Sequence, residues 1–397
     1  MTNRSLPAAL PEGAVLLHVG PYKTGSTAIQ NALFARQDRL AEHGVAYPGV
    51  EYRAARPGWS ALQWSPVGSR VPEAVEWRSF ADEVRALHPN RVCVSTEDFG
   101  SIGEPALARR IVDDLGGDNV HVVYVCRALH RVLPSHWQER VKSAVETRTY
   151  EEYLRSVLLP GSRDEAGIAF WRNHDLVRTA DAWLPVVGSD RFHVVVTDDS
   201  DRSLLREAFE SMLALPAGYL EDQDVHGNHS LSVNSVEMLR RLNAVARERD
   251  WRLGDYAELI RHGALPALFT MAPSAHDDRI AALPPWALEP ASRIAAGRIE
   301  LIGARGLRVI GDPECLRLPA DFEPSEDVAA PLRISVDSAV ALTAGVMERD
   351  YHVRRRLRGK VNRQQRRLES LTGGDPRPPG SGARSWLARM GSCRHPK

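Results

Sequence analysis

The sequence is poor in cysteine and has no long hydrophobic run. The four cysteines lie far apart and form neither a C-x-x-C pair nor a Cys/His cluster at ligand spacing: Cys93, Cys126, Cys315 and Cys393. A disulfide framework and a zinc site are therefore not expected. No run of about 18 apolar residues occurs, and residues 1–13 have no basic region followed by an apolar stretch. These absences predict a cytoplasmic protein with no membrane span and no bound metal.

Net charge is also absent, because 51 Lys and Arg residues balance 51 Asp and Glu residues. The balance is uneven along the chain. Residues 351–397, the basic tail, contain 13 Lys and Arg against Glu369 and Asp375, a net charge of +11, so the first 350 residues carry −11. We expect residues 354–367 to form a solvated helix and residues 373–385 a flexible linker. The tail is interpreted as a solubilising appendage with no specific nucleic acid, although contact with nucleic acid, an acidic partner or anionic lipid stays open.

The chain has enough apolar residues for a full core, since 43% of its 397 residues are hydrophobic. Short apolar runs bounded by turn residues predict strands at residues 14–19, 44–48, 91–95, 120–126 and 191–197, and a late strand at 308–312 is a weaker prediction. Helical patterns alternate with these strands. We therefore predict a doubly wound α/β fold, with a mainly parallel sheet of about five strands and helices on both faces.

Between the first strand and the first helix lies a short polar loop. Five consecutive residues there offer backbone N–H groups, hydroxyls and one ammonium at a helix N-terminus: Lys23, Thr24, Gly25, Ser26 and Thr27. Such a terminus favours anions, because its N–H groups have no partner within the helix and the helix dipole is positive there. The loop therefore predicts a phosphate site, although a simple turn with a helix cap is the alternative.

The order of residues in this loop argues against an ordinary ATP or GTP site. A Walker A loop has its lysine directly after the second glycine, whereas Lys23 precedes Gly25 by two residues. The order K-T-G-S-T instead resembles the 5′-phosphosulfate loop of sulfotransferases that use 3′-phosphoadenosine 5′-phosphosulfate (PAPS), with Tyr22 standing where many members have proline. The resemblance implies a P-loop-like three-layer fold and PAPS as the co-substrate.

A second stretch, at the end of the strand over residues 120–126, strengthens the resemblance. The sequence V-Y-V-C-R-A-L-H-R-V-L-P-S is similar to the family's 3′-phosphate motif, which implies that Arg127 and Ser135 hold the 3′-phosphate. Pro134 suits the first turn of a helix, which would place Ser135 in that turn. Further along, the loop with Asn228 and Ser230 resembles a segment that closes over the nucleotide; helix capping is an equal alternative.

Sulfuryl transfer also needs charge stabilisation and a proton acceptor. Lys23 would neutralise the leaving 5′-phosphate. Glu97 is the candidate base, because it follows the strand over residues 91–95 and so lies at the same sheet edge as the loop. His130 and His136 are the competing candidates, and a purely structural role is the alternative for Glu97.

The predicted organisation is a sulfotransferase-like α/β domain over residues 12–320, with a loop-rich insert at about 51–71 and a largely helical part at about 231–300. A linker and helix follow over 321–350, and then the basic tail. The predicted activity is transfer of the sulfuryl group to a hydroxyl or amine of a carbohydrate or other small molecule. A nucleotide or small-molecule kinase and a non-catalytic nucleotide-binding protein are the alternatives, and neither the acceptor nor the oligomeric state follows from the sequence.

Overall fold

The structure is a computed structural model. It describes residues 6–66, 69–87, 89–198, 200–201, 203–221, 231–270, 283–325 and 335–371. The chain divides into two compact units, Met1–Gly345 and Val346–Lys397. Among the described helices, none combines the length and the apolar character that a membrane span requires.

The first unit is built on one fully parallel sheet, which confirms the predicted fold class. Its strands are β1 (Ala14–His18), β2 (Val45–Ala46), β3 (Arg91–Ser95), β4 (Val120–Cys126), β5 (Phe192–Val196) and β6 (Arg308–Ile310). Their order across the sheet is β2-β3-β1-β4-β5-β6. The chain order reverses direction beside β1, and the crevice at such a switch point, beyond the carboxyl ends of the strands, is where open α/β sheets bind ligands.

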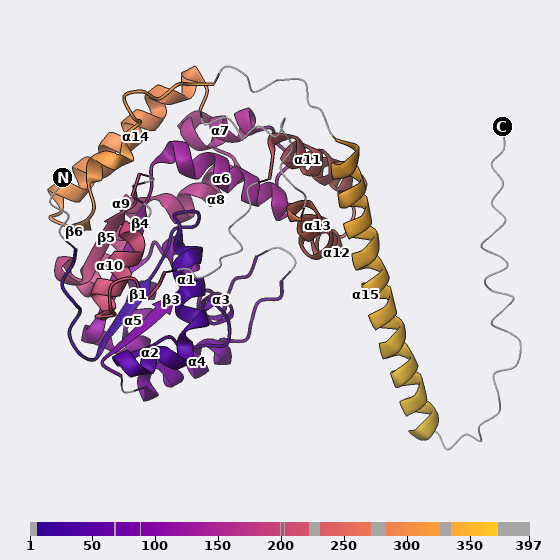
Figure 1. Cartoon of the computed structure of the whole chain (residues 1–397), viewed down its shortest axis with the longest axis horizontal. Coiled ribbons are helices and arrows are strands. Elements are labelled where there is room, and N and C mark those ends of the chain that lie inside the picture. The colour runs from indigo at the N-terminus through magenta and orange to yellow at the C-terminus, as the bar shows by residue number, and fades with distance from the viewer. Residues whose placement is uncertain are drawn as a thin grey trace, which may run out of the picture. The chain divides into compact units, whose positions relative to one another are not determined.

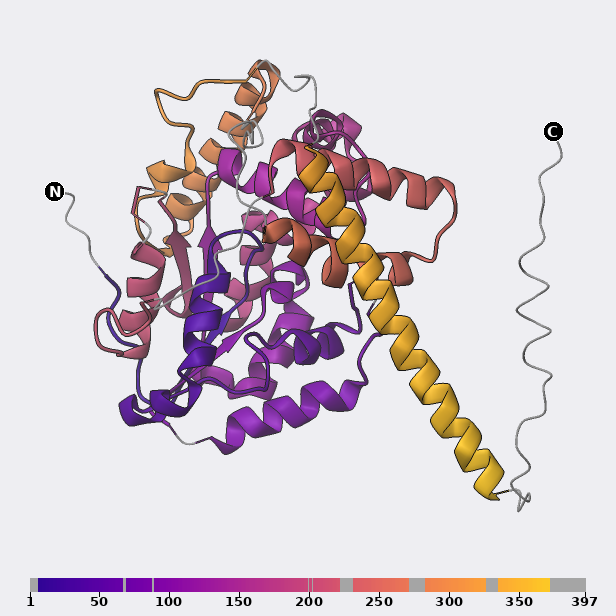
Figure 2. The same ribbon diagram turned by 45° about the vertical axis from the view of Figure 1, so that its right-hand side comes forward.

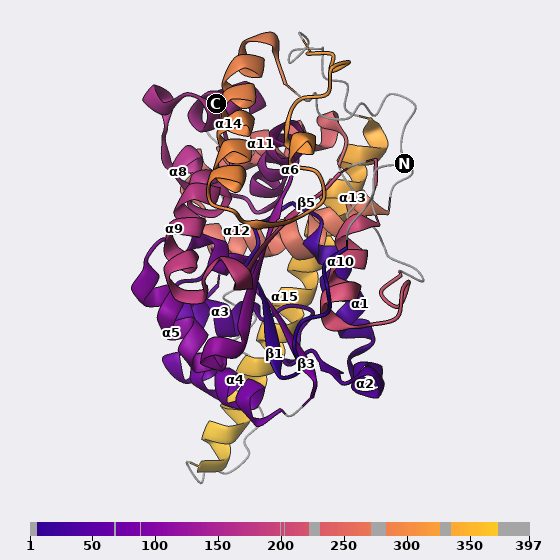
Figure 3. The same cartoon turned by 90° about the vertical axis from the view of Figure 1, so that its left-hand side faces the viewer.

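Helices cover both faces of this sheet (Figure 3). One apolar cluster joins a strand face to α3 (Ala55–Leu62), α4 (Ala74–Ala86), α5 (Pro105–Leu115), α9 (Leu176–Val187) and α14 (Pro285–Ala304). The other joins the opposite face to α1 (Ser26–Ala35), α2 (Gln37–Leu40) and α10 (Leu204–Leu213). Neighbouring residues of β1 take opposite sides, Leu17 in the first cluster and Leu16 in the second, as the two-residue period of a strand requires.

The remaining helices include a group beside the sheet, visible in Figures 1 and 2. They are α6 (Leu129–Lys142), α7 (Tyr150–Leu158), α8 (Glu165–His174), α11 (Val233–Glu248), α12 (Leu253–Leu259) and α13 (Leu265–Phe269), whereas α15 (Val336–Leu371) runs from the first unit into the second. Within this group α6 packs against α7 and α11, and α8 packs against the 3₁₀ turn Glu97–Ser101 that follows β3.

The stretch at about 51–71, expected to be loop-rich, contains helix α3. Its buried residues include Ala61, which packs in the core, and Ser60, whose hydroxyl joins it to α4. The Ser60 hydroxyl accepts a hydrogen bond from the Trp77 N–H at 3.1 Å. The small residues Ala55, Gly58, Ser60 and Ala61 are all buried, so α3 packs closely against its neighbours.

Candidate active site

The loop after β1 begins the site. Lys23 and Gly25 both have left-handed backbone conformations, with φ of 66° and 100°. At Gly25 a side chain would be strained, and this residue is the N-cap of α1 without any side-chain cap. The first turn of α1 also contains no acidic residue. Within α1 itself, therefore, no side chain caps the terminus and no acidic residue lies in the first turn, which suits an anion.

The loop's hydroxyl groups fix its shape. Thr24 is buried, and its Oγ1 donates to the carbonyl of Pro21 at 2.9 Å and lies 3.3 Å from Ser26 Oγ. Ser26 is likewise buried and begins α1, whereas Thr27, in the same turn, is half-buried. The residues of the predicted phosphate site thus lie together in one loop, and hydrogen bonds within the loop hold its shape.

A pocket of about 510 Å³ opens beside this loop. Its lining includes Thr24 and Gly25 from the loop, Arg127 from the end of β4, and Thr197 from the end of β5. Arg127 Nη1 donates to the Lys23 carbonyl at 3.3 Å. The structure therefore brings Arg127 to the loop across 104 residues of sequence, and both face the same cavity.

Acidic residues also line this pocket, but they have local partners. Asp198 accepts from the Ser200 N–H at 2.9 Å, and hydrogen bonds from Ser200 lower the pKa of Asp198. Glu221 pairs with Arg206 at 3.2 Å. The lowered pKa keeps Asp198 ionised, so the pocket holds negative charge beside the groups of its lining that are suited to an anion: Arg127, Arg206 and the α1 terminus.

The Lys23 ammonium lies toward α6. Its Nζ is 3.3 Å from Glu139 Oε2, and Glu139 also pairs with Lys142 at 2.9 Å. Burial opposes the ionised form of Glu139, but Lys23 and then Lys142 outweigh it and lower the pKa of this carboxyl to about 2. Glu139 is therefore an anion that holds Lys23 on the α6 side of the loop.

Glu97, in the turn after β3, packs against the residues that precede the loop and is 6% exposed. A Cβ on Gly20 would meet the Glu97 carbonyl oxygen at 2.8 Å, so the close approach of these two segments needs glycine. Arg53 Nη1 lies 3.4 Å from Glu97 Oε2 and 3.6 Å from Asp98 Oδ2. Burial raises the pKa of Glu97; Arg53 opposes this effect and Asp98 adds to it.

Asn173, at the end of α8, joins the two sides of the site. Its Oδ1 accepts from the Tyr22 N–H at 3.0 Å, and its Nδ2 donates to the Glu97 carbonyl at 2.9 Å. The Tyr22 hydroxyl donates to Asp98. Through these bonds one buried amide fixes the spacing between the Lys23 loop and the Glu97 turn.

The prediction for Pro134 was wrong. Helix α6 begins at Leu129, so Pro134 lies inside the helix and Ser135 is beyond the first turn. The buried residues Leu129 and Val132 extend the helix toward β4, and this packing outweighs the preference of proline for a first turn. Ser135 is half-buried on α6 and is not among the described residues that line the pocket.

The two histidines that compete with Glu97 for the role of base are both in α6. His136 is half-buried: burial lowers its pKa to about 3, and its Nδ1 shares a 2.7 Å hydrogen bond with the Tyr153 hydroxyl. His130 is buried, and its ring packs edge-on against Phe322. Both side chains therefore belong to the packing of α6 in this structure.

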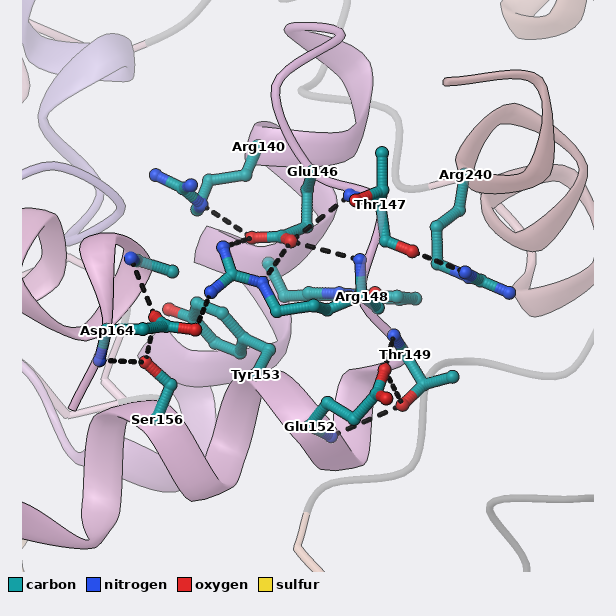
Figure 4. Close-up of polar contacts among 12 residues, drawn as sticks. Arg140, Glu146, Thr147, Arg148, Thr149, Glu152, Tyr153, Ser156, Asp164 and Arg240 are labelled. Atoms are coloured by element: carbon teal, nitrogen blue, oxygen red, sulfur yellow. Dashed lines mark hydrogen bonds and ion pairs between the residues drawn. The ribbon is translucent and has the colours of Figure 1, made fainter. Parts of the chain in front are cut away.

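A buried carboxylate anchors the far end of α6 (Figure 4). Glu146 is 0% exposed and receives 2.8 Å hydrogen bonds from Arg140 Nε and Arg148 Nε. Burial alone would raise the pKa of Glu146, but the hydrogen bonds from Arg148 and Arg140 lower it. Arg148 also forms an ion pair with Asp164, the N-cap residue of α8. The network ties α6, with Glu139, to α8, with Asn173.

Asn228 and Ser230 lie outside the described residues. Sequence reasoning missed Arg53, Asn173 and Glu139. Arg53 and Asn173 carry no local signal, because they reach the site through tertiary packing. Glu139 did carry a local signal, because it lies one helical turn after Ser135 on the same helix.

No protein-family model and no curated protein matches the chain. Among solved structures, the chain is similar to the crystal structure of a sulfotransferase from Alicyclobacillus acidocaldarius. The two are 14% identical, with a TM-score of 0.37, and the match covers 63% of this chain and 96% of the other.

Proposed function

We propose that this protein is a sulfotransferase that moves the sulfuryl group of PAPS to a hydroxyl or amine of a small-molecule or carbohydrate acceptor. The observation that carries the proposal is the arrangement around the 510 Å³ pocket. An uncapped helix N-terminus and Arg127 face one cavity, while Lys23 in the same loop pairs with Glu139 and the nearby Glu97 pairs with Arg53.

The residues present fit a nucleotide with phosphate groups on both the 5′ and the 3′ position of its ribose. The loop from Lys23 to Thr27 supplies N–H groups and hydroxyls for the 5′-phosphosulfate. Arg127, at the end of β4, supplies a planar cation for the 3′-phosphate. Ser135, from α6, is the proposed second contact with this phosphate, and Asn228 and Ser230 are proposed to contact the nucleotide.

The chemistry is an in-line displacement at sulfur. The acceptor oxygen forms a bond to sulfur as the bond from sulfur to the 5′-phosphate oxygen breaks, and that phosphate leaves with the electron pair. Lys23 is proposed to neutralise the developing charge, since a positioned cation stabilises charge that appears in the transition state. For this role the ammonium exchanges part of its contact with Glu139, 3.3 Å away, for the leaving oxygen.

Glu97 is proposed to take the acceptor proton. A base works best when its pKa approaches the operating pH, and burial raises the pKa of Glu97 in that direction. Arg53 bridges Glu97 and Asp98, so it holds the carboxylate in place, while Asn173 fixes its backbone. Glu97 is the proposed base rather than His136, because the His136 Nδ1 is bonded to the Tyr153 hydroxyl and burial lowers the pKa of His136 to about 3, which makes it a weak base.

Two measurements test the proposal in sequence. Adenosine 3′,5′-bisphosphate is expected to raise the melting temperature of the full-length protein more than ATP with magnesium, because ligands that bind the native state stabilise it. PAPS labelled in its sulfuryl group is then incubated with the protein and an extract of the organism that encodes it, and a labelled product is expected. A larger shift with ATP and magnesium, together with no labelled product, would favour a kinase.

A further inference from the structure

The second unit contains a helix with two different exposed faces. Helix α15 is one continuous helix from Val336 to Leu371 (Figure 2), and its residues 353–368 lie wholly in the second unit. None of the proposed nucleotide or catalytic residues belongs to this segment. Its side chains therefore need an explanation other than the proposed transfer reaction.

One face of this segment is apolar and open. Leu357, Val361 and Leu368 are 53%, 57% and 61% exposed, and Val353 is half-buried. At about 100° per residue these four side chains fall within an arc of about 80°. Large apolar side chains gathered on one exposed stripe mark a surface that another apolar phase or molecule covers.

The opposite face is basic. Arg355, Arg358 and Arg366 are all exposed, and the same helical geometry places them within an arc of about 80°, whose middle lies about 140° from the middle of the apolar stripe. The exposed side chains of Arg356, Lys360 and Arg363 lie between this arc and the stripe. Arg354 lies at the edge of the stripe and pairs with Asp350 at 2.7 Å. The segment is thus a basic amphipathic helix with a narrow apolar stripe.

We propose that residues 353–368 of α15 bind the surface of an anionic lipid bilayer, with the apolar stripe in the boundary between headgroups and acyl chains. An anionic bilayer interacts favourably with both faces of the helix. The acyl boundary covers Leu357, Val361 and Leu368, and the anionic headgroups attract the Lys and Arg side chains. The helix lies along the interface and does not cross the bilayer.

Each of the other possible partners would interact favourably with only one face of the helix. A nucleic acid would contact the basic side chains but leave the apolar stripe in water. A second copy of the helix in a parallel coiled coil would cover the stripe but bring Arg354 beside its counterpart and add like charges along the flanks. Charge complementarity together with the stripe therefore favours the lipid surface.

The test measures partition of the full-length protein onto vesicles by sedimentation. The vesicles are either pure phosphatidylcholine or an equimolar mixture of phosphatidylcholine and phosphatidylserine. We expect binding only to the vesicles with phosphatidylserine, and weaker binding as salt rises, because salt screens exposed charges. Absence of binding to these vesicles at low salt would overturn the proposal.

Two double variants with the same change of net charge separate the apolar contribution from charge. Leu357→Glu with Val361→Glu changes the stripe, whereas Asn362→Glu with Gln365→Glu changes exposed positions outside it. The stripe variant should lose roughly tenfold or more in partition relative to its control. Equal losses in the two variants would contradict insertion of the stripe.

The circular dichroism of each variant shows whether the helix is retained. Leu357→Ala with Val361→Ala serves as a second stripe variant, because alanine has high helix propensity and preserves the helix. This variant should also bind the vesicles less, so the test remains decisive even if the glutamate pair unfolds the helix. A wild-type dimer that the alanine pair dissociates, without vesicle binding, would overturn the proposal in favour of a coiled coil. Binding to duplex DNA that the alanine pair leaves unchanged, again without vesicle binding, would overturn it in favour of a nucleic-acid partner.

Discussion

Glu97→Gln is the sharpest test of the proposed chemistry. Glutamine keeps the size of the side chain and an oxygen that can accept from Arg53 at the 3.4 Å site, and the Glu97 carbonyl keeps its bond from Asn173. Arg53 also retains Asp98 at 3.6 Å, so its charge stays paired. The fold and the affinity for PAPS should therefore change little. Loss of the base should lower the single-turnover rate by about 10² to 10⁴.

The dependence of the transfer rate on pH also tests the role of Glu97. A base must be deprotonated, so the wild-type rate should rise with pH through a pKa above the ordinary glutamate value of 4.5, because burial raises it and Asp98 adds to the effect. Asp98→Asn removes that neighbouring charge and should move the rise to lower pH. The assay is rapid-quench transfer from labelled PAPS, beside melting temperature. An unchanged single-turnover rate in folded Glu97→Gln would refute the role of Glu97.

The remaining predictions concern the loop, the Glu146 network and the tail. Lys23→Ala should lower turnover by about 10² to 10³ with an unchanged melting temperature; near-wild-type turnover would contradict its role. Glu146→Gln should destabilise the protein by roughly 1–3 kcal/mol in denaturant titrations, because Arg140 loses its buried anion and Arg148 keeps only Asp164. A stability equal to wild type would show that the network is not needed. A chain ending at Tyr351 should retain transfer to a water-soluble acceptor, and a folded but inactive truncation would refute this separation.

The sequence was sufficient to predict the sheet and the position of the loop. Each buried strand is a short apolar run, and the polar residues that follow β1, β3 and β4 meet at one edge because the strands are parallel. This rule alone puts Lys23, Glu97 and Arg127 in one region of the fold. Strand β6 was also visible as the run R-V-I, although its edge position depends on pairing with β5.

The supporting residues were not predictable, because their contacts span long separations. Asn173 lies 151 residues from Tyr22, and Arg53 lies 44 residues from Glu97. Neither belongs to a local pattern that indicates a partner. The error at Pro134 has a related cause: α6 begins at Leu129 because its first turns pack in the interior, and this packing outweighs local preference.

Calorimetry with two nucleotides tests the central claim most directly. Wild-type protein should bind adenosine 3′,5′-bisphosphate more tightly than adenosine 5′-monophosphate, which lacks the 3′-phosphate. Arg127→Ala should weaken binding of the bisphosphate by roughly 10- to 150-fold, as expected for loss of charged hydrogen bonds, and leave binding of the monophosphate nearly unchanged. Equal affinities of the wild-type protein for the two nucleotides, or equal losses in the variant, would contradict a site built for PAPS.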